Sequence, residues 1–274
     1  MSSLRIITPD KLEEEYLDPF NARRLDWTRS VFLSRRRLFV ETGSTKLGII
    51  WLILDPLIHT LVYLFVFSTI RHNEDPTALF IGLGIIRGMQ RTLAITSNPK
   101  IDLTGGLKID RVSTRAISGS IVLHIVATTL LSGLGVCSVL FILGNTVTGT
   151  FFFLVFLLAN NLFWYGAGLN LLSLTTRMPD LHKVTSYFGT GMFFFSPVLY
   201  TIEATSGWHR TASIYNPMSY FVEASRRMAE GEGYAGFDIL PPMGFVVLAI
   251  ITSLLVFYGN RRLDGIRWRM SDRD

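Results

Sequence analysis

Six long apolar segments restrict the fold of this chain more than any other feature of its sequence. A run of about 18 or more apolar residues with few charges is long enough to cross the hydrocarbon core of a bilayer as a helix. Lipid cannot satisfy backbone polar groups, so such runs form helices, and they lack the alternation of barrel strands. We therefore predict an all-α integral membrane fold with six transmembrane helices. They occupy residues 47–70, 77–95, 118–143, 151–174, 184–200 and 239–258.

The overall composition supports this fold. Of the 274 residues, 49% are hydrophobic and 17% are charged, whereas about 25% of the residues in soluble domains are charged. The second segment is the weakest because Arg87, Gln90 and Arg91 interrupt it. The net charge of +5 comes from basic residues that border the apolar segments. This position indicates contact with anionic lipid headgroups rather than with nucleic acid.

Lysine and arginine are concentrated in alternate loops, and such residues mark the cytoplasmic side of a membrane. Basic clusters precede the first segment and follow the second, fourth and sixth. The loop after the first segment has only Arg71, and the loop after the third has no basic residue. We predict a multi-pass protein of the cytoplasmic (inner) membrane with both termini in the cytoplasm. The segment 201–238 is then external, although it contains Arg210, Arg226 and Arg227.

The region before the first apolar segment has two parts. Residues 1–19 are interpreted as a cytoplasmic tail, which lacks the apolar core of a cleavable signal peptide. Residues 20–46 predict an amphipathic helix that lies in the cytoplasmic membrane surface, with packing on a soluble partner as the alternative. The transmembrane domain covers residues 47–260, and residues 261–274 form a cytoplasmic tail. The membrane-interface residues of the amphipathic helix are Trp27, Phe32, Arg35, Arg36 and Phe39.

The sequence does not predict catalytic machinery in this chain. Its five histidines lack the spacing of a metal site, and neither a nucleophile elbow nor a glycine-rich phosphate loop is present. We expect no catalytic residue, metal or cofactor here; if the protein uses ATP, a partner hydrolyses it. Asp55 is the one carboxylate well inside an apolar segment. Ion-coupled carriers usually place acidic groups in their spans, so this class is disfavoured.

Three short motifs resemble one transporter family. Residues 47–57 are similar to the pattern L-G-x-x-W-x-x-L-x-P-L, and residues 196–200 are similar to S-P-V-x-Y. Residues 216–226 contain N-P-M followed by E-x-x-R. Together these motifs resemble the permeases of type-2 ABC exporters for polysaccharides, which include O-antigen, teichoic acid and capsule exporters. The resemblance covers roughly residues 25–262.

The resemblance implies a permease subunit of an ATP-driven exporter of a lipid-linked polysaccharide. Two copies of the chain would form the channel, and two nucleotide-binding ATPase subunits that bind ATP and Mg²⁺ would drive it. In the family, the loop between the second and third spans carries a coupling helix for the ATPase, although an ordinary solvated loop is the alternative. The coupling residues are then Leu107, Lys108, Asp110, Arg111 and Arg115. External re-entrant helices between the fifth and sixth spans would form a gate at Asn216, Pro217, Glu223 and Arg226.

Arg87, Gln90 and Arg91 fall on one helix face, and they depart from the apolar or Trp-Asn residues usual in the family at this place. A charge inside a membrane is costly unless it meets water or a partner. We hypothesise that this face lines the substrate path and binds phosphate or acidic sugars, because guanidinium binds phosphate through two donors. The alternative is a shorter span, with these residues at the cytoplasmic boundary.

Aromatic residues are the second candidate for the substrate path, because sugars stack on aromatic faces. The alternative is that these side chains face lipid or form interfacial belts. Asp55 and His59 are four residues apart and are expected to pair structurally. The aromatic path candidates are Phe156, Trp164, Tyr165, Phe193 and Tyr200.

Two further functions stay open on the sequence alone. A drug or lipid exporter permease of the same superfamily would share the spans and the missing phosphate loop. A membrane enzyme, such as a lipid phosphatase or glycosyltransferase, would need clustered Asp, His or Arg at one membrane face, and no such cluster is visible.

Overall fold

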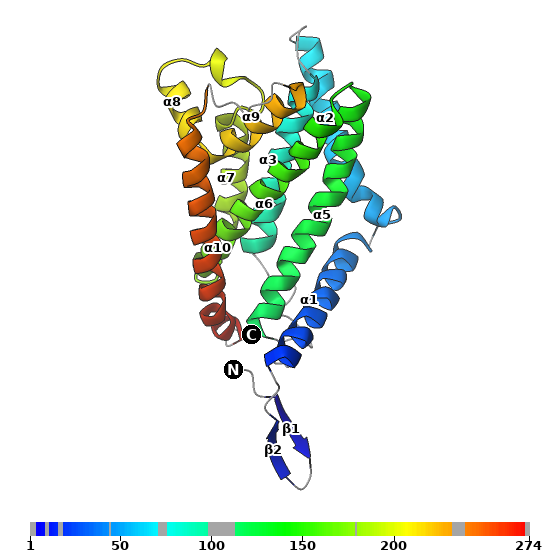
Figure 1. Cartoon of the computed structure of the whole chain (residues 1–274), viewed down its shortest axis with the longest axis vertical. Coiled ribbons are helices and arrows are strands. Elements are labelled where there is room, and N and C mark those ends of the chain that lie inside the picture. The colour runs from blue at the N-terminus through cyan, green and yellow to red at the C-terminus, as the bar shows by residue number, and fades with distance from the viewer. Residues whose placement is uncertain are drawn as a thin grey trace.

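The computed structural model describes residues 4–8, 11–15, 19–43, 45–70, 76–97, 113–178, 180–231 and 239–271. Strands β1 (Leu4–Thr8) and β2 (Lys11–Glu15) form an antiparallel hairpin in which Leu4 lies opposite Glu15. The hairpin projects away from a bundle of helices (Figure 1). The sequence did not predict these strands within the segment 1–19.

The bundle begins with helix α1 (Pro19–Thr42), which is followed by a 3₁₀ turn (Gly48–Ile50) that leads into α2. A second 3₁₀ turn (Ile202–Ala204) precedes α8. Side-chain caps at Ser113 and Thr146 begin α5 and α6, each accepting a hydrogen bond from a backbone N–H three residues later. The remaining helices are α2 (Trp51–Ile70), α3 (Pro76–Ser97), α5 (Thr114–Ile142), α6 (Val147–Thr175), α7 (Leu181–Phe195), α8 (Gly207–Tyr215), α9 (Pro217–Glu230) and α10 (Pro242–Ser271).

Five helices in the described part of the chain are long and apolar enough to cross a membrane: α2 with its preceding turn, α3, α5, α6 and α10. These are five of the six predicted spans. The fifth prediction, residues 184–200, corresponds to α7, whose 15 residues reach only about 22 Å. Pro197 lacks a backbone N–H and forces the preceding residue into an extended conformation. Ser196 is extended (ψ 151°) and ends the helix there.

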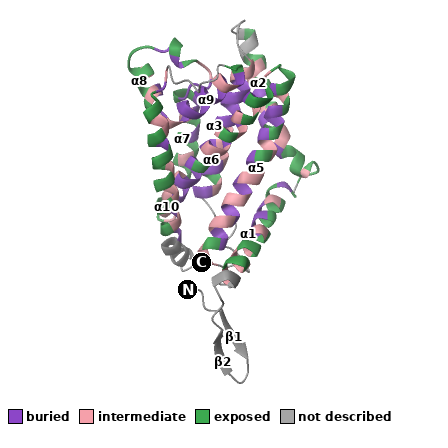
Figure 2. Cartoon of the chain, viewed as in Figure 1, coloured by how far each residue is buried: buried purple, intermediate pink, exposed green. Residues whose placement is uncertain are grey.

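Helix α3 lies at the centre of the bundle and contacts α2, α5, α6, α7 and α9. In its membrane-length segment 61% of the residues are buried, compared with 17% in the first span and in α10 (Figure 2). Small residues allow this packing. A Cβ atom on Gly88 would lie 2.7 Å from the Asn161 side chain of α6, so α6 approaches the α3 backbone closely there.

Helix α1 packs along the first half of α5. Ser30 Oγ donates a hydrogen bond of 3.1 Å to the Ala116 carbonyl, and Leu33, Ser34 and Arg37 are buried on the same side. The predicted membrane-facing aromatics are on the outside: Trp27, Phe32 and Phe39 are 60%, 65% and 74% exposed. Arg35 and Arg36 are exposed beside them.

Candidate functional site

Two cavities of about 470 Å³ each lie on either side of α3. The α5-side cavity is bounded by α1, α2, α3, α5 and α6, and the α7-side cavity by α2, α3 and α7. Arg87 and Gln90 line both cavities, whereas Arg91 lines only the α5-side cavity. The polar face of the second predicted span therefore borders internal space on both sides.

The described wall of the α7-side cavity contains basic, hydroxyl and aromatic side chains and no carboxylate. Its basic groups are Arg87 and His182, the latter in the first turn of α7. Three hydroxyl groups of α7 complete the polar part of the wall: Thr185, Ser186 and Thr190. Such a wall provides donors and positive charge for an anion.

The aromatic part of the α7-side cavity is a set of packed rings. Tyr63 of α2 lies 5.4 Å from Phe193 of α7, and Phe193 meets Phe194 edge to face at 5.0 Å. Gln90 Nε2 donates a hydrogen bond of 3.0 Å to the Gly189 carbonyl and connects α3 to α7 in the same wall. Phe193 is the one aromatic path candidate in the lining of this cavity.

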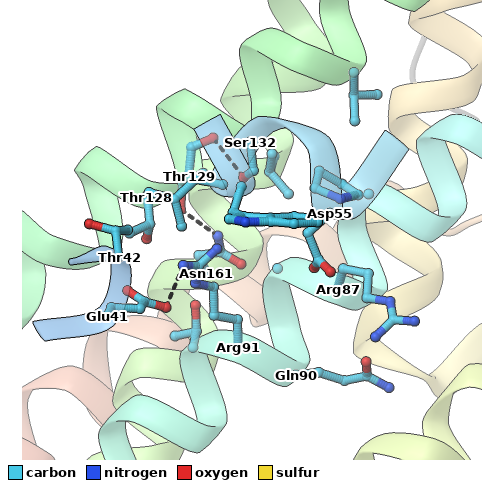
Figure 3. A pocket seen from close by; sticks show the side chains of 18 of the residues that line it. Glu41, Thr42, Asp55, Arg87, Gln90, Arg91, Thr128, Thr129, Ser132 and Asn161 are labelled. Carbon is cyan, nitrogen blue, oxygen red and sulfur yellow. Dashed lines mark hydrogen bonds and ion pairs between the residues drawn. The ribbon is translucent and has the colours of Figure 1, made fainter. Parts of the chain in front are cut away.

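An ion-pair cluster joins three helices at the α5-side cavity (Figure 3). Arg91 Nη2 of α3 donates to Glu41 Oε1 of α1 at 2.5 Å, and His124 Nε2 of α5 lies 3.1 Å from Glu41 Oε2. Burial raises the pKa of the Glu41 carboxyl, but the hydrogen bond from His124 and the charges of Arg91 and His124 outweigh burial and hold that pKa below its ordinary value. The cluster fixes the end of α1 to the bundle.

The inner wall of the α5-side cavity is neutral and polar. Asn161 Nδ2 donates a hydrogen bond of 2.7 Å to Thr129 Oγ1, and both residues are 3% exposed (Figure 3). Thr128 and Ser132 add hydroxyl groups. Hydroxyl and amide side chains inside an apolar bundle favour a polar occupant over an apolar one.

Arg87 differs from Arg91 in its partners. Arg91 pairs with Glu41, whereas the Arg87 guanidinium forms no hydrogen bond or ion pair with the described residues. Asp55 lines the same cavity, but its carboxylate pairs with His59 Nδ1 at 3.3 Å, as expected from their spacing. Arg87 is thus a guanidinium within a membrane-length helix that two cavities reach.

The predicted gate residues lie at the end of the bundle where α3 begins. Asn216 caps α9, accepting from Met218 N at 3.0 Å and donating to the Phe195 carbonyl at 3.0 Å. Arg226 Nη2 donates to the carbonyls of Val198 (2.7 Å) and Ala78 (3.3 Å). These bonds connect α9 to the end of α7 and to the first turn of α3.

Glu223 and Arg226 lie together in α9, as their spacing predicts. Their charged groups are 3.8 Å apart, and each side chain is 5% exposed. Pro217 is the first residue of the helix, where its missing N–H needs no partner. The use of Arg226 as a donor to three backbone carbonyls, including that of Tyr200 at 3.1 Å, was not predicted. Pro197 was the available signal, since a chain interrupted by proline leaves carbonyls without helical partners.

The remaining aromatic candidates lie outside the linings of both cavities. Trp164 Nε1 donates to Asn160 Oδ1 at 3.1 Å inside the core. Tyr165 is 1% exposed, and its hydroxyl lies 3.0 Å from Asn260 Oδ1 of α10. Phe156 is partly buried and packs near Phe152. Tyr200 bonds the Phe195 carbonyl at 3.1 Å.

The coupling prediction falls mostly outside the described residues. Leu107, Lys108, Asp110 and Arg111 lie in the segment that the structure leaves out, and Arg115 is exposed in the first turn of α5. Sequence reasoning also missed the cavity residues Glu41, His182 and Asn161, and His124, which pairs with Glu41. Their only signal was a polar side chain near a helix end or inside an apolar run.

Residues 30–228, well over half of the chain, match the family described as ABC-2 type transporter. No curated protein matches the chain. In this family the membrane domain is the permease component, which is not itself the ATPase and pairs with an ATP-binding subunit. The chain is therefore a multi-pass membrane protein that belongs to the ABC-2 type transporter family as a permease.

Proposed function

We propose that this permease exports a lipid-linked polysaccharide, O-antigen-like or capsule-like, across the cytoplasmic membrane. Two copies of the chain form the channel, and two partner subunits hydrolyse Mg²⁺-bound ATP. The α7-side cavity carries this proposal, because its described wall combines Arg87 and His182 with hydroxyl and aromatic groups and contains no carboxylate.

Each part of that wall matches a part of the substrate. A guanidinium binds phosphate or carboxylate through charge-assisted hydrogen bonds, and Arg87 has no described partner that would compete. The rings of Tyr63, Phe193 and Phe194 offer faces for sugars, and hydroxyl groups of α7 exchange hydrogen bonds with sugar hydroxyls. Stacking needs no fixed sequence of sugars, so a polymer can slide.

The same proposal makes α7 the sixth crossing. Helix α1 begins and α10 ends at the same end of the bundle (Figure 1), which requires an even number of passages between the two ends. Helix α7 with the turn from Ser196 to Tyr200 provides the passage that the five longer helices leave missing. Both termini are then cytoplasmic, α1 lies in the cytoplasmic membrane surface, and α8 and α9 are external.

In this arrangement α9 is the external gate. Opening it requires release of the bonds from Arg226 to the carbonyls of Val198 and Ala78. ATP binding brings the partner subunits together and moves the coupling segment at residues 107–115. Movement of α3 and α7 relative to each other widens the α7-side cavity.

For the test, the permease is co-purified with the ATPase encoded by an adjacent gene, and the complex is reconstituted in vesicles with candidate glycolipids. ATP hydrolysis and glycolipid export are then measured. Losing one charged hydrogen-bond donor costs about 1.5–3 kcal/mol, so Arg87→Gln is expected to lower glycolipid stimulation by about ten-fold or more. Arg210→Gln is the matched control, since Arg210 is exposed in α8 and lines neither cavity.

Normal assembly with undiminished export in Arg87→Gln would contradict the proposed path, and failure to co-purify an ATPase would contradict the proposed complex. The same assay separates polysaccharide export from export of a drug or lipid. A neutral apolar substrate would stimulate hydrolysis equally in the unaltered protein and in Arg87→Gln.

A further inference from the structure

The α5-side cavity contains charges of both signs, unlike the α7-side cavity. Its charged residues are two arginines and two carboxylates, contributed by three helices. Arg91 and His124 both pair with Glu41. Arg87 and Asp55 remain on the other side of the cavity (Figure 3), and they form no ion pair with each other in the described structure. The cavity therefore offers one cationic and one anionic contact that a single ligand can bridge.

We propose that the α5-side cavity binds a phosphoethanolamine headgroup of a membrane phospholipid. The phosphate lies against the Arg87 guanidinium, which suits it through bidentate donation. The ammonium group lies against the Asp55 carboxylate, in place of the contact with His59. Trp51 lines the same cavity one helical turn before Asp55, so its ring and the carboxylate share a face. A tryptophan face attracts an ammonium group.

The neutral wall of the cavity fits the rest of such a headgroup. Thr128, Thr129 and Asn161 line it. Asn161 donates to Thr129 Oγ1, and Thr128 donates to the His124 carbonyl. The second amide hydrogen of Asn161 and the hydroxyl hydrogen of Thr129 are then the donors that can bind ester oxygens.

The mouth of the cavity fits a lipid rather than a soluble zwitterion. Apolar side chains at the start of the first span are exposed beside it: Leu47 by 45%, Ile49 by 48% and Ile50 by 51%. Asp55 lies about 10 Å along the helix from Gly48. A lipid can therefore place its headgroup in the polar cavity and its acyl chains along these apolar residues.

This inference goes beyond glycolipid export. Both proposals use Arg87, which lines both cavities, so Asp55 is the residue through which the two fail separately. Asp55 and Trp51 line the α5-side cavity but not the α7-side cavity. Variants of Asp55 therefore report on headgroup binding without removing a residue of the proposed substrate path.

Native mass spectrometry of the full-length purified protein is the direct test. The protein is titrated with phosphatidylethanolamine, phosphatidylcholine and phosphatidylglycerol of the same acyl composition, and with soluble O-phosphoethanolamine. We expect phosphatidylethanolamine to bind about ten-fold more tightly than either other lipid. Phosphatidylglycerol lacks the ammonium group, and the methylated ammonium of phosphatidylcholine cannot donate a hydrogen bond to Asp55.

Asp55→Asn should bring the preference for phosphatidylethanolamine over phosphatidylglycerol close to one, and Asp55→Glu should retain part of it. Arg87→Gln should weaken binding of all three lipids. Asp180→Asn is the matched control and should keep the preference, since Asp180 is exposed outside both cavities. Equal binding of the three lipids by the unaltered protein would overturn the proposal, as would a preference that survives in Asp55→Asn. Soluble phosphoethanolamine that binds as tightly as the lipid would overturn the assignment to a lipid.

Discussion

Helices α2 and α3 are neighbours, but the more hydrophobic of the two is the less buried. The first span, which contains α2, has the higher mean hydropathy, yet 17% of its residues are buried, whereas 61% are buried in α3. In a soluble protein the more apolar helix would be the more buried one. In a bilayer the outer surface meets hydrocarbon, so the helix that faces lipid needs the apolar side chains and the central helix can carry polar ones.

This difference explains why the least apolar span carries the candidate site. Arg87, Gln90 and Arg91 are tolerated in α3 because cavities and other helices, not lipid, surround them. A search for the most hydrophobic segments finds the spans but ranks α3, the helix that carries the candidate site, last. The polar interruptions in a membrane segment are therefore the better guide to function.

The largest expected effect comes from removing matched leucines in the two helices. Leu79 of α3 is 2% exposed, and Leu61 of α2 is 55% exposed. Leu79→Ala leaves a cavity among packed helices and should cost about 2–5 kcal/mol of unfolding free energy. Leu61→Ala should cost less than about 1 kcal/mol, because lipid replaces the lost contacts.

Unfolding of both variants in mixed micelles, followed by circular dichroism, measures the two costs. Equal costs would show that the exposed side of α2 is covered by protein. A second copy of the chain packed on α2 would produce that result.

The next largest loss of stability is expected from removing the hydrogen bonds of Arg226 at the beginning of α3. Arg226 donates to the Ala78 carbonyl in the first turn of α3 and to the Val198 carbonyl after α7. Arg226→Met removes charged hydrogen bonds to buried carbonyls and should cost about 1.5–3 kcal/mol. Arg227→Met is the comparison. Arg227 pairs with Glu203, which is 62% exposed, and lies 3.9 Å from the buried Glu223, so its loss should be the smaller of the two.

The same unfolding assay compares the two arginine variants. A smaller loss for Arg226→Met than for Arg227→Met would mean that water or lipid satisfies the carbonyls at this end of the bundle. Faster substrate-independent leakage through reconstituted vesicles in Arg226→Met alone would sharpen the gate assignment of α9.

The sequence predicted the five membrane-length helices because length and apolar content suffice to locate a membrane helix. It extended the fifth span too far, since Pro197 sits inside an apolar run but ends α7 at Phe195. The beginning of α9 was predictable from Asn216 and Pro217, which are local signals.

The site itself was only partly predictable. Helical spacing places Arg87 and Arg91 on one face, but nothing in that spacing says that Arg91 pairs with Glu41 and Arg87 does not. Those partners come from α1 and α5, far away in the sequence, and their approach depends on how three helices pack. Local pattern can therefore identify a polar helix face, while the structure is needed to divide it between two cavities.

The smallest expected effect concerns the contact between α1 and α3. Burial raises the pKa of Glu41, but His124 and Arg91 lower it by more than burial raises it. The pKa of Glu41 in the folded protein therefore lies below the ordinary value of 4.5. A carboxyl with a lowered pKa binds protons more readily in the unfolded chain, so its stabilising effect is present above pH 4.5 and is lost as the pH falls through the folded pKa. Because Glu41 is 36% exposed, we expect Glu41→Gln to cost only about 0.2–1 kcal/mol at pH 7.

The cost of Glu41→Gln should vanish at pH values below the folded pKa, where the native carboxyl is also neutral. Thermal unfolding at pH 7 and at the lowest pH that keeps the protein folded measures it, with Glu203→Gln as the exposed control. A cost that is the same at both pH values would mean that Glu41 stabilises α1 through the packing of its side chain and not through its charge. Helix α1 would then be fixed to the bundle by its packing on α5, and its ion pair with α3 would add nothing to stability.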